Sequence, residues 1–212
     1  MRLTPDMCEL IGAIIGDGNI YKNNYVDITG DKNLDLEYLR RRLLPIVKEQ
    51  LKYVPKIGPG SRSIRLRINN RKFTFFLNNL GIKSGKGKSQ TVIIPSKISE
   101  NWRLAKACIR GIMDTDGCLS FDKRRVYRTP YLRIILHIKN RDLIYQIYSI
   151  LESRGFAPTY STQVAYNGRM HTLYLSGKEQ VLKYIKDIGF SNKRHILKTR
   201  RLIYKQAPVT QW

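Results

Sequence analysis

The sequence predicts an α+β protein made of two pseudo-symmetric halves, each with the element order αββαββα. Three observations predict this fold class: a motif that occurs twice, segments in which apolar and polar residues alternate as in half-buried strands, and segments of helical periodicity between them. The chain has 212 residues, of which 42% are apolar, enough for a packed core. We expect one motif helix from each half at the centre, with an antiparallel sheet on either side.

Two pairs of similar segments carry the repeat. LIGAIIGDG at 10–18 and IRGIMDTDG at 109–117 share two glycines and an aspartate at an offset of 99 residues, namely Gly12 and Gly111, Asp17 and Asp116, and Gly18 and Gly117. KNLDLEY at 32–38 matches KNRDLIY at 139–145 in five of seven positions, at an offset of 107. An eight-residue insertion between Gly117 and Lys139 accounts for the difference. We therefore divide the chain into halves at 1–92 and 93–212.

Local signals predict where the helices begin. Thr4 is a suitable N-cap with Pro5 at the first helical position, which predicts a helix near 5–16. Ser99 followed by Glu100 predicts the equivalent helix near 100–114. A second helix in each half should begin near Asn33 and near Asn140. A third should close each half, in RLRINNRKFTFFLNNLGI and LYLSGKEQVLKYIKDIGF.

The strands are predicted from alternation and turn residues. In SIRLRIN the apolar Ile64, Leu66 and Ile68 alternate with polar residues, which indicates a strand with one apolar and one basic face. Asn167-Gly168 is a strong signal for a two-residue hairpin turn. GIKSGKGKSQT, at 81–91, should be a flexible basic loop that leads into the second half.

Composition points to a nucleic-acid partner. Lysine and arginine number 39 against 16 acidic residues, a formal charge of +23. The alternative is that these cations only keep the surface soluble, although soluble surfaces usually intersperse both signs. No segment reaches the ~18 apolar residues that span a bilayer, and the N-terminus lacks a secretory apolar region, so we expect an intracellular protein, in the cytoplasm, at a nucleoid or in an organelle.

The three cysteines suggest neither disulfides nor zinc. They are odd in number and form no C-x-x-C pair, so we expect Cys8, Cys108 and Cys118 to be buried or half-buried thiols. The three histidines also lack metal-ligand spacing.

The repeated Asp-Gly places one carboxylate at the end of each motif helix. That end of a helix carries partial negative charge and unsatisfied carbonyl groups, which favour a cation. If Gly12 and Gly111 let the two helices pack closely, Asp17 and Asp116 meet at one end and form an oxygen site suited to Mg²⁺. A single Asp-Gly would more simply be a helix stop, and two copies at matching places favour the functional interpretation.

These motifs resemble those of the LAGLIDADG homing endonucleases, and the resemblance covers nearly the whole chain. It implies the monomeric type, which carries both motifs in one chain, with sheets that form a DNA-binding saddle. It also implies that Asp17 and Asp116 bind the catalytic metal, with the carbonyls of Gly16 and Thr115 as further ligands. Mg²⁺ is the expected cofactor, Mn²⁺ should substitute, and Ca²⁺ should bind without supporting cleavage. The chain departs from the motif at Ile15, whose equivalent is Asp114.

The family also implies a basic residue after the second strand of each half. Lys32 and Lys139 occupy that place, where they would stabilise charge in the transition state or position water. The alternative for both is an ordinary phosphate contact or a lysine at the start of a helix. The glutamine that often precedes this lysine is absent, since Asp31 and Ile138 stand there. Water would attack each scissile phosphate without a covalent intermediate.

The remaining basic surface is interpreted as DNA recognition, because two-stranded ribbons fit the major groove. Candidates for contacts with bases or phosphates are Lys22, Asn24, Arg65, Arg67, Asn69, Arg71, Lys123, Arg124, Arg125, Arg128, Arg133, His137, Gln163, Thr172 and Tyr174. A packed hairpin histidine is the alternative for His137.

Two other classes of nucleic-acid-binding protein would also be strongly basic. An intron RNA maturase, or a binder of the same fold that has lost cleavage, would have the same charge. A ribosomal or architectural protein would also be basic, but it would have no need for paired Asp-Gly helix ends.

Overall fold

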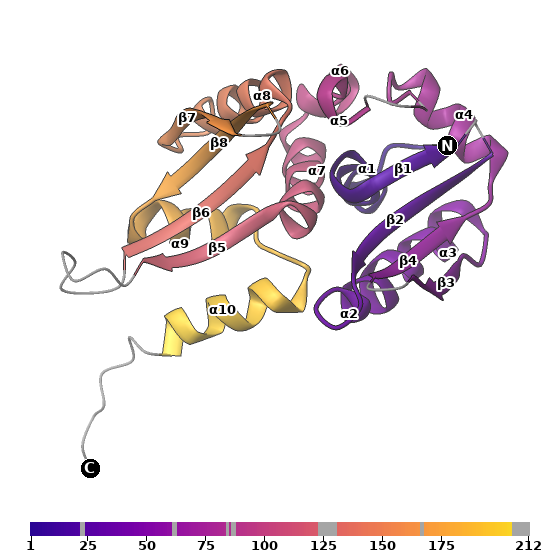
Figure 1. The fold of residues 1–212 in the computed structure, drawn as a ribbon, viewed down its shortest axis with the longest axis horizontal. Helices are drawn as coiled ribbons and strands as arrows, with labels where there is room; N and C mark the ends of the chain where they lie inside the picture. Colours follow the sequence, from indigo (N-terminus) through magenta and orange to yellow (C-terminus); the bar gives the residue numbers. More distant parts are fainter. Residues whose placement is uncertain are drawn as a thin grey trace, which may run out of the picture.

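The computed structural model describes residues 1–21, 24–60, 63–83, 85, 88–122, 131–165 and 168–204. It consists of two α/β halves that pack through one helix from each, α1 and α7, which lie side by side at the centre with a sheet on either side (Figure 1). Of the described residues, none belong to a helix long and apolar enough to cross a bilayer. The predicted fold class is confirmed.

The first half contains a motif helix, four strands and the helices that cover them. Its elements are α1 (Pro5–Asp17), β1 (Gly18–Tyr21), β2 (Tyr25–Asp31), α2 (Leu36–Tyr38), a π-helical turn (Leu39–Leu43), α3 (Leu44–Leu51), β3 (Lys56–Pro59), β4 (Ser63–Ile68) and α4 (Arg71–Asn79). Two short helices connect it to the second half, α5 (Lys88–Thr91) and α6 (Ser96–Ser99).

The second half repeats this order with longer strands and adds one helix. Its elements are α7 (Trp102–Thr115), β5 (Gly117–Asp122), β6 (Tyr131–Ile138), α8 (Arg141–Glu152), β7 (Pro158–Ala165), β8 (Gly168–Ser176), α9 (Lys178–Asp187) and α10 (Lys193–Tyr204). The longer β5 and β6 accommodate the insertion that the repeat predicted, although its tip lies outside the described residues.

The two sheets have the same antiparallel topology. Their strand orders are β1-β2-β4-β3 and β5-β6-β8-β7, so the strand that follows each motif helix is at an edge. In β4, Ile64, Leu66 and Ile68 are buried while Arg65 is exposed, as the alternation predicted. The apolar face of each sheet therefore closes the core, and the other face is left for polar and basic side chains.

The motif helices approach each other with pseudo-twofold symmetry. A Cβ at Gly12 would overlap the carbonyl oxygen of Cys108, and a Cβ at Gly111 would overlap that of Glu9. Residues 9 and 108 are themselves equivalent by the offset of the repeat. The two contacts are thus copies of one another, which confirms the prediction that these glycines allow close packing.

A buried ion-pair cluster ties the helix pair to both halves. The Glu9 side chain is fully buried. It accepts hydrogen bonds from Arg42 of the first half, Nε to Oε1 2.8 Å, and from Arg110 of the second, Nε to Oε2 2.9 Å. Burial opposes ionisation of Glu9, but the hydrogen bond from Arg42 and the charges of both arginines outweigh it and lower the pKa of Glu9. Loss of this carboxylate would remove the acid that the two partly buried arginines share and would leave Arg42 with its ion pair to Asp6 at 2.7 Å.

Several predicted boundaries are confirmed and others are wrong. Thr4 caps α1, and its hydroxyl accepts the Met7 N–H at 3.1 Å. The cap of α7 is Asn101, not Ser99, which ends the separate helix α6. Asn101 can accept the N–H of Leu104 three residues on, the usual N-cap geometry, which Ser99 is too early to provide.

The second helices of the two halves differ although their sequences match. Asn140 caps α8 as predicted, because its side chain accepts the N–H of Leu143. In the first half the helix begins only at Leu36, since Asp31 accepts the N–H groups of Asn33 and Leu34 and holds the chain in a turn.

Three smaller predictions need correction. Cys8 and Cys108 are buried, but Cys118 is exposed, because it lies on the outward face of the edge strand β5. The hairpin of β7 and β8 is present, but Gly168 pairs with Ala165 as the first residue of β8 and is not a turn residue, while Asn167 lies outside the described residues. The predicted loop at 81–91 contains α5 at its end.

Candidate active site

The two motif helices end at one pocket of about 280 Å³. Its lining residues come from the ends of α1 and α7, from the segment before α6, and from the junction of β6 and α8, namely Ile15, Gly16, Asp17, Val92, Asp116, His137, Ile138, Lys139 and Leu143. The structure therefore brings together both predicted acids, one of the predicted lysines and one of the predicted carbonyl ligands.

The two acids occupy slightly different positions at their helix ends. Asp17 is the last residue of α1 and is exposed, whereas Asp116 is the C-cap of α7 and is half-buried. The backbone N–H of Asp116 donates to the carbonyl of Ile112 at 2.9 Å, so its backbone is tied to the last turn of α7. Asp116 therefore has less freedom of direction than an acid on a loop would have.

Gly16 keeps the space between the helix ends open. A Cβ at this position would overlap the hydroxyl of Thr115 and lie 2.9 Å from Oδ2 of Asp116. The carboxylate of the second half thus faces the backbone of the first. Carboxylate and carbonyl oxygens at two helix C-termini form the donor set that a hard divalent cation prefers, and the absence of a side chain at Gly16 leaves room for one beside Asp116.

The predicted carbonyl ligand at Thr115 already has a partner. Its carbonyl accepts a hydrogen bond from Nη2 of Arg194 at 2.7 Å, and its hydroxyl donates back to the carbonyl of Ile112 at 2.9 Å. A carbonyl has a second lone pair, so a metal contact would be additional to the Arg194 bond.

The two predicted lysines are placed differently. Lys139 follows β6 directly and lines the pocket with Asp17 and Asp116. Lys32 follows β2 in the same way and, like Lys139, is exposed, but the described lining of the pocket does not include it. The repeat alignment could not reveal this difference, because the turn after β2 is held by Asp31 and Asp35 of the first half.

His137 lines the pocket, whereas the sequence predicted a DNA contact or a packed hairpin histidine at this position. Its Nδ1 lies 2.6 Å from the hydroxyl of Thr172. Thr172 was expected to face DNA, but it is buried and instead orients the His137 ring. Nε2 is then the ring nitrogen left for substrate. The equivalent residue of the first half is Gly30, so this group belongs to one half only.

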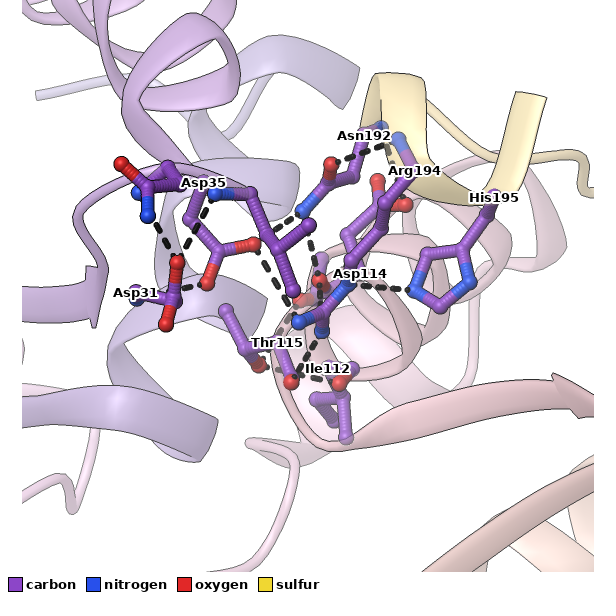
Figure 2. A network of polar contacts seen from close by, with 11 residues as sticks. Asp31, Asp35, Ile112, Asp114, Thr115, Asn192, Arg194 and His195 are labelled. Carbon is purple, nitrogen blue, oxygen red and sulfur yellow. Dashed lines mark hydrogen bonds and ion pairs between the residues drawn. The ribbon is translucent and has the colours of Figure 1, made fainter. Parts of the chain in front are cut away.

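Behind the pocket, the end of α7 is enclosed by a polar network (Figure 2). Asp114 is fully buried, and its carboxylate accepts the backbone N–H groups of Ser191 and Asn192 at 2.8 Å and 3.0 Å. Burial raises the pKa of Asp114 to about 7, although both hydrogen bonds favour the ionised form. The repeat identifies Asp114 only as the equivalent of Ile15, and its role could not be predicted, since its partners lie about 80 positions further along the chain.

The predicted DNA contacts fall into groups. Exposed residues that remain candidates are Asn24, Arg65, Asn69, Arg71 and Gln163, and half-buried ones are Arg67, Arg133 and Tyr174. Outside the described residues lie Lys22, Lys123, Arg124, Arg125 and Arg128.

Among these candidates, Arg67 forms a bidentate ion pair within the protein. Its Nε and Nη2 donate to the two carboxylate oxygens of buried Asp27 at 2.7 Å and 2.6 Å, and it lies over the ring of Tyr25. A bidentate pair of this kind holds Arg67 on the sheet face.

Comparisons with known proteins agree with this architecture. A family model described as a LAGLIDADG-like domain matches residues 103–189, which include most of α7 and all of α8 and α9. Among curated proteins, the chain is 24% identical over 206 residues to the replication factor C small subunit of Thermococcus kodakarensis, and 25% identical over 181 residues to the reverse gyrase of Methanocaldococcus jannaschii. These matches cover 95% and 82% of this chain, but only 22% and 10% of the two relatives.

Solved structures share the fold over most of the chain. The homing endonuclease I-DmoI in complex with DNA and Ca has a TM-score of 0.62 at 19% identity, and the match covers 89% of this chain and 91% of that one. Its complex with DNA and Mn gives the same score and covers 98% of that chain. Full-length WhiA from Thermatoga maritima has a TM-score of 0.60 at 14% identity, with 98% of this chain and 62% of that one covered. The fold therefore occurs in the homing endonuclease I-DmoI and also in WhiA, whose name states no nuclease activity.

Proposed function

We propose that this chain, which matches a LAGLIDADG-like domain model over residues 103–189 and carries two similar motifs in one polypeptide, is a site-specific endonuclease that hydrolyses one phosphodiester bond in each strand of a long DNA target. One observation carries the proposal: Asp17 and Asp116, at the ends of two helices separated by 99 positions, line a single pocket together with Lys139. Two Asp-Gly pairs that served only to end their helices would not need to lie at the same pocket.

Asp17 and Asp116 would hold divalent metal in the proposed site, with the carbonyl of Gly16 as a further oxygen donor. Mg²⁺ bound there would make an attacking water more acidic and neutralise charge on the leaving oxygen. Each acid would serve one strand. Mn²⁺ should replace Mg²⁺, and Ca²⁺ should support binding alone.

The protein groups around the acids have separate tasks. Lys139 places an ammonium group beside both acids, where it would offset the charge that develops on the scissile phosphate. His137, held by Thr172, would contact a phosphate or the attacking water through Nε2. We assign Lys32 to a phosphate contact outside the pocket, which is the alternative that its sequence position had left open.

The sheets would supply affinity. With a formal charge of +23, the chain can replace many counterions on DNA, so its affinity should fall steeply as salt rises. One chain already contains both motifs, and we propose that it acts as a monomer. The matches to about a fifth and a tenth of two otherwise unrelated proteins are consistent with a unit that can reside inside longer chains.

The decisive experiment is cleavage of a plasmid library that carries candidate target sites, with Mg²⁺, with Ca²⁺ and with chelator, followed by mapping of the ends. We expect defined double-strand breaks with Mg²⁺ only. The control is the double variant D17N/D116N, which should bind DNA and leave it intact. If the wild-type protein binds a specific site tightly but cuts neither strand with Mg²⁺ or Mn²⁺, the chain is a binder and the nuclease proposal is wrong.

A further inference from the structure

A polar clasp, formed by Asn192 and Arg194 near the start of α10, holds the last turn of α7 (Figure 2). Nη2 of Arg194 donates to the carbonyls of Asp114 at 3.0 Å and Thr115 at 2.7 Å. Nδ2 of Asn192 also lies 3.2 Å from the carbonyl of Asp114. With the backbone bonds to the Asp114 carboxylate, the segment contacts this helix end at five points.

The last carbonyls of a helix lack intrahelical partners, and a cation near them is stabilising. The last turn of α7 itself contains no basic residue. Arg194 provides that cation from a helix that lies beyond the repeated αββαββα units. One nitrogen, Nη2, contacts both carbonyls while Nη1 lies 3.3 Å from Asp35, and the planar guanidinium fixes these contacts relative to one another, which a lysine ammonium cannot do. The direction of Asp116, the next residue, therefore depends on a turn that the clasp immobilises.

The same two residues also reach the first half. Nδ2 of Asn192 donates to Oδ1 of Asp35 at 2.7 Å, and Nη1 of Arg194 lies 3.3 Å from the same oxygen. The other oxygen of Asp35 accepts the backbone N–H of Asp31 at 2.8 Å. Asp35 and Asn192 are both buried, so these bonds are shielded from water. The clasp thus joins the α7 end to the turn that carries Lys32.

The motif sequences fit this arrangement. At the position that precedes Thr115, α7 has the buried Asp114, and the equivalent residue of α1 is Ile15. The acid therefore occurs in the helix that the clasp contacts. An apolar side chain there would leave the backbone N–H groups of Ser191 and Asn192 without this acceptor.

We propose that Asn192 and Arg194 are positioning residues for the cleavage reaction: they set the direction of Asp116 and couple it to the first half of the protein. This inference rests on the proposed function for its catalytic part. The clasp acts through the backbone of α7 and touches no reacting atom.

The test compares Arg194→Met and Arg194→Lys with a matched control, Lys193→Met. Lys193 is on the same helix and also contacts the first half, through Glu37 at 2.7 Å, but its hydrogen bond does not involve α7. Two readouts are needed. The first is amide hydrogen exchange over residues 112–117 of the full chain. The second is single-turnover cleavage of each strand of an end-labelled duplex at several Mg²⁺ concentrations.

We expect exchange over 112–117 to become at least tenfold faster in Arg194→Met, with a smaller change in Arg194→Lys and none in Lys193→Met. The strand whose cleavage depends more on Asp116, identified with Asp116→Asn, should slow at least tenfold and need more Mg²⁺, while the other strand changes little. DNA affinity in Ca²⁺ should stay constant.

Unchanged exchange over 112–117 in both Arg194 variants would overturn the proposal, and so would equal slowing of both strands in proportion to the loss of folded protein. Exchange does not require cleavage. If the wild-type chain cuts no DNA, the proposed nuclease function fails, and the exchange result still decides whether the clasp holds the helix end.

Discussion

The ends of α1 and α7 have matching sequences and different surroundings. Asp17 is exposed at the end of α1, whereas Asp116 is half-buried and follows a helix turn enclosed by Asp114, Asn192 and Arg194. Lys139, which follows the second strand of the second half, lines the pocket. Its equivalent in the first half, Lys32, is not among the described lining residues. A duplicated motif therefore preserved the acids while the structures that support them diverged.

This difference suggests a division of labour. We interpret the second half as the side that fixes the geometry of the site, because it contributes Lys139, His137 and the enclosed helix end. The first half contributes a more exposed acid, which has more room to adapt to DNA. Substitutions at equivalent positions should then have unequal effects, with the two acids as the exception.

The largest effects should come from Asp17→Asn and Asp116→Asn. Each should reduce double-strand cleavage by about a thousandfold or more, because loss of an ionised metal ligand removes the charge that holds the cation. Affinity for the target in Ca²⁺ or chelator should stay similar or rise, since a carboxylate beside polyanionic DNA is repulsive. Gel-shift titration and strand-resolved cleavage measure both. Double-strand cleavage at the wild-type rate by both variants would show that the assignment of the site is wrong.

The lysines should separate the halves most clearly. Lys139→Ala is expected to lower the single-turnover rate by about a hundredfold, equivalent to ~3 kcal/mol of charge stabilisation, because Lys139 lines the pocket together with both acids. Lys32→Ala should lower it less than about fivefold, because Lys32 is not among the described residues that line the pocket with the two acids. The same duplex and the same Mg²⁺ concentration serve for both. Equal losses would mean that Lys32 reaches the reacting phosphate when DNA is bound.

Glu9 and Cys108 occupy equivalent positions on the two motif helices, so substitutions there compare what each residue contributes to the stability of the fold. Glu9→Gln should lower the free energy of unfolding by about 3 kcal/mol, because Arg42 and Arg110 would lose the buried ionised acid that they share. Cys108→Ala removes one buried sulfur and should cost ~1 kcal/mol. Urea unfolding at pH 7 compares the two. A larger cost for the cysteine variant would contradict the role given to the ion-pair cluster.

Two buried groups around the α7 end should affect stability with pH in opposite directions. Burial raises the pKa of Asp114 to about 7 and lowers the pKa of His195 to about 3. The unfolded chain loses the Asp114 proton near pH 4, and the folded chain loses it near pH 7, so stability falls as pH rises between them. The unfolded chain protonates His195 below pH 6.5 and the folded chain does not, so stability rises with pH in that range.

Substitutions should uncover each contribution. Between pH 5 and pH 6.5, the free energy of unfolding of Asp114→Asn should rise by about 2 kcal/mol relative to wild type, and that of His195→Gln should fall by a similar amount. The reason is that each variant retains only one of the two titrating groups. Glutamine at 195 keeps an acceptor for Nε of Arg194, which lies 3.0 Å from Nε2 of His195. Denaturant unfolding at the two pH values measures the slopes. Parallel slopes in the two variants would rule out the opposed titrations.

Features set by near neighbours in the chain could be predicted well. Thr4 with Pro5, the alternation in β4 and the cap at Asn140 depend on contacts within a few residues. The start of the helix after β2 could not be predicted, because Asp31 and Asp35 compete for backbone N–H groups that a helix would otherwise use. The extra helix α10 fell outside the repeat on which the predicted element order was built.

The sequence by itself determined the twofold architecture and the place of the two acids, because repetition at a fixed offset requires equivalent helices, and glycines at equivalent positions allow their close approach. Only the tertiary structure decided that Lys139 and not Lys32 lines the pocket, that Thr172 supports His137, and that the start of α10 encloses the end of α7. The physical reason is distance along the chain. A cap or an alternation is encoded within one turn or strand, whereas Arg194 meets the α7 carbonyls across about 80 residues, through packing that no local pattern specifies.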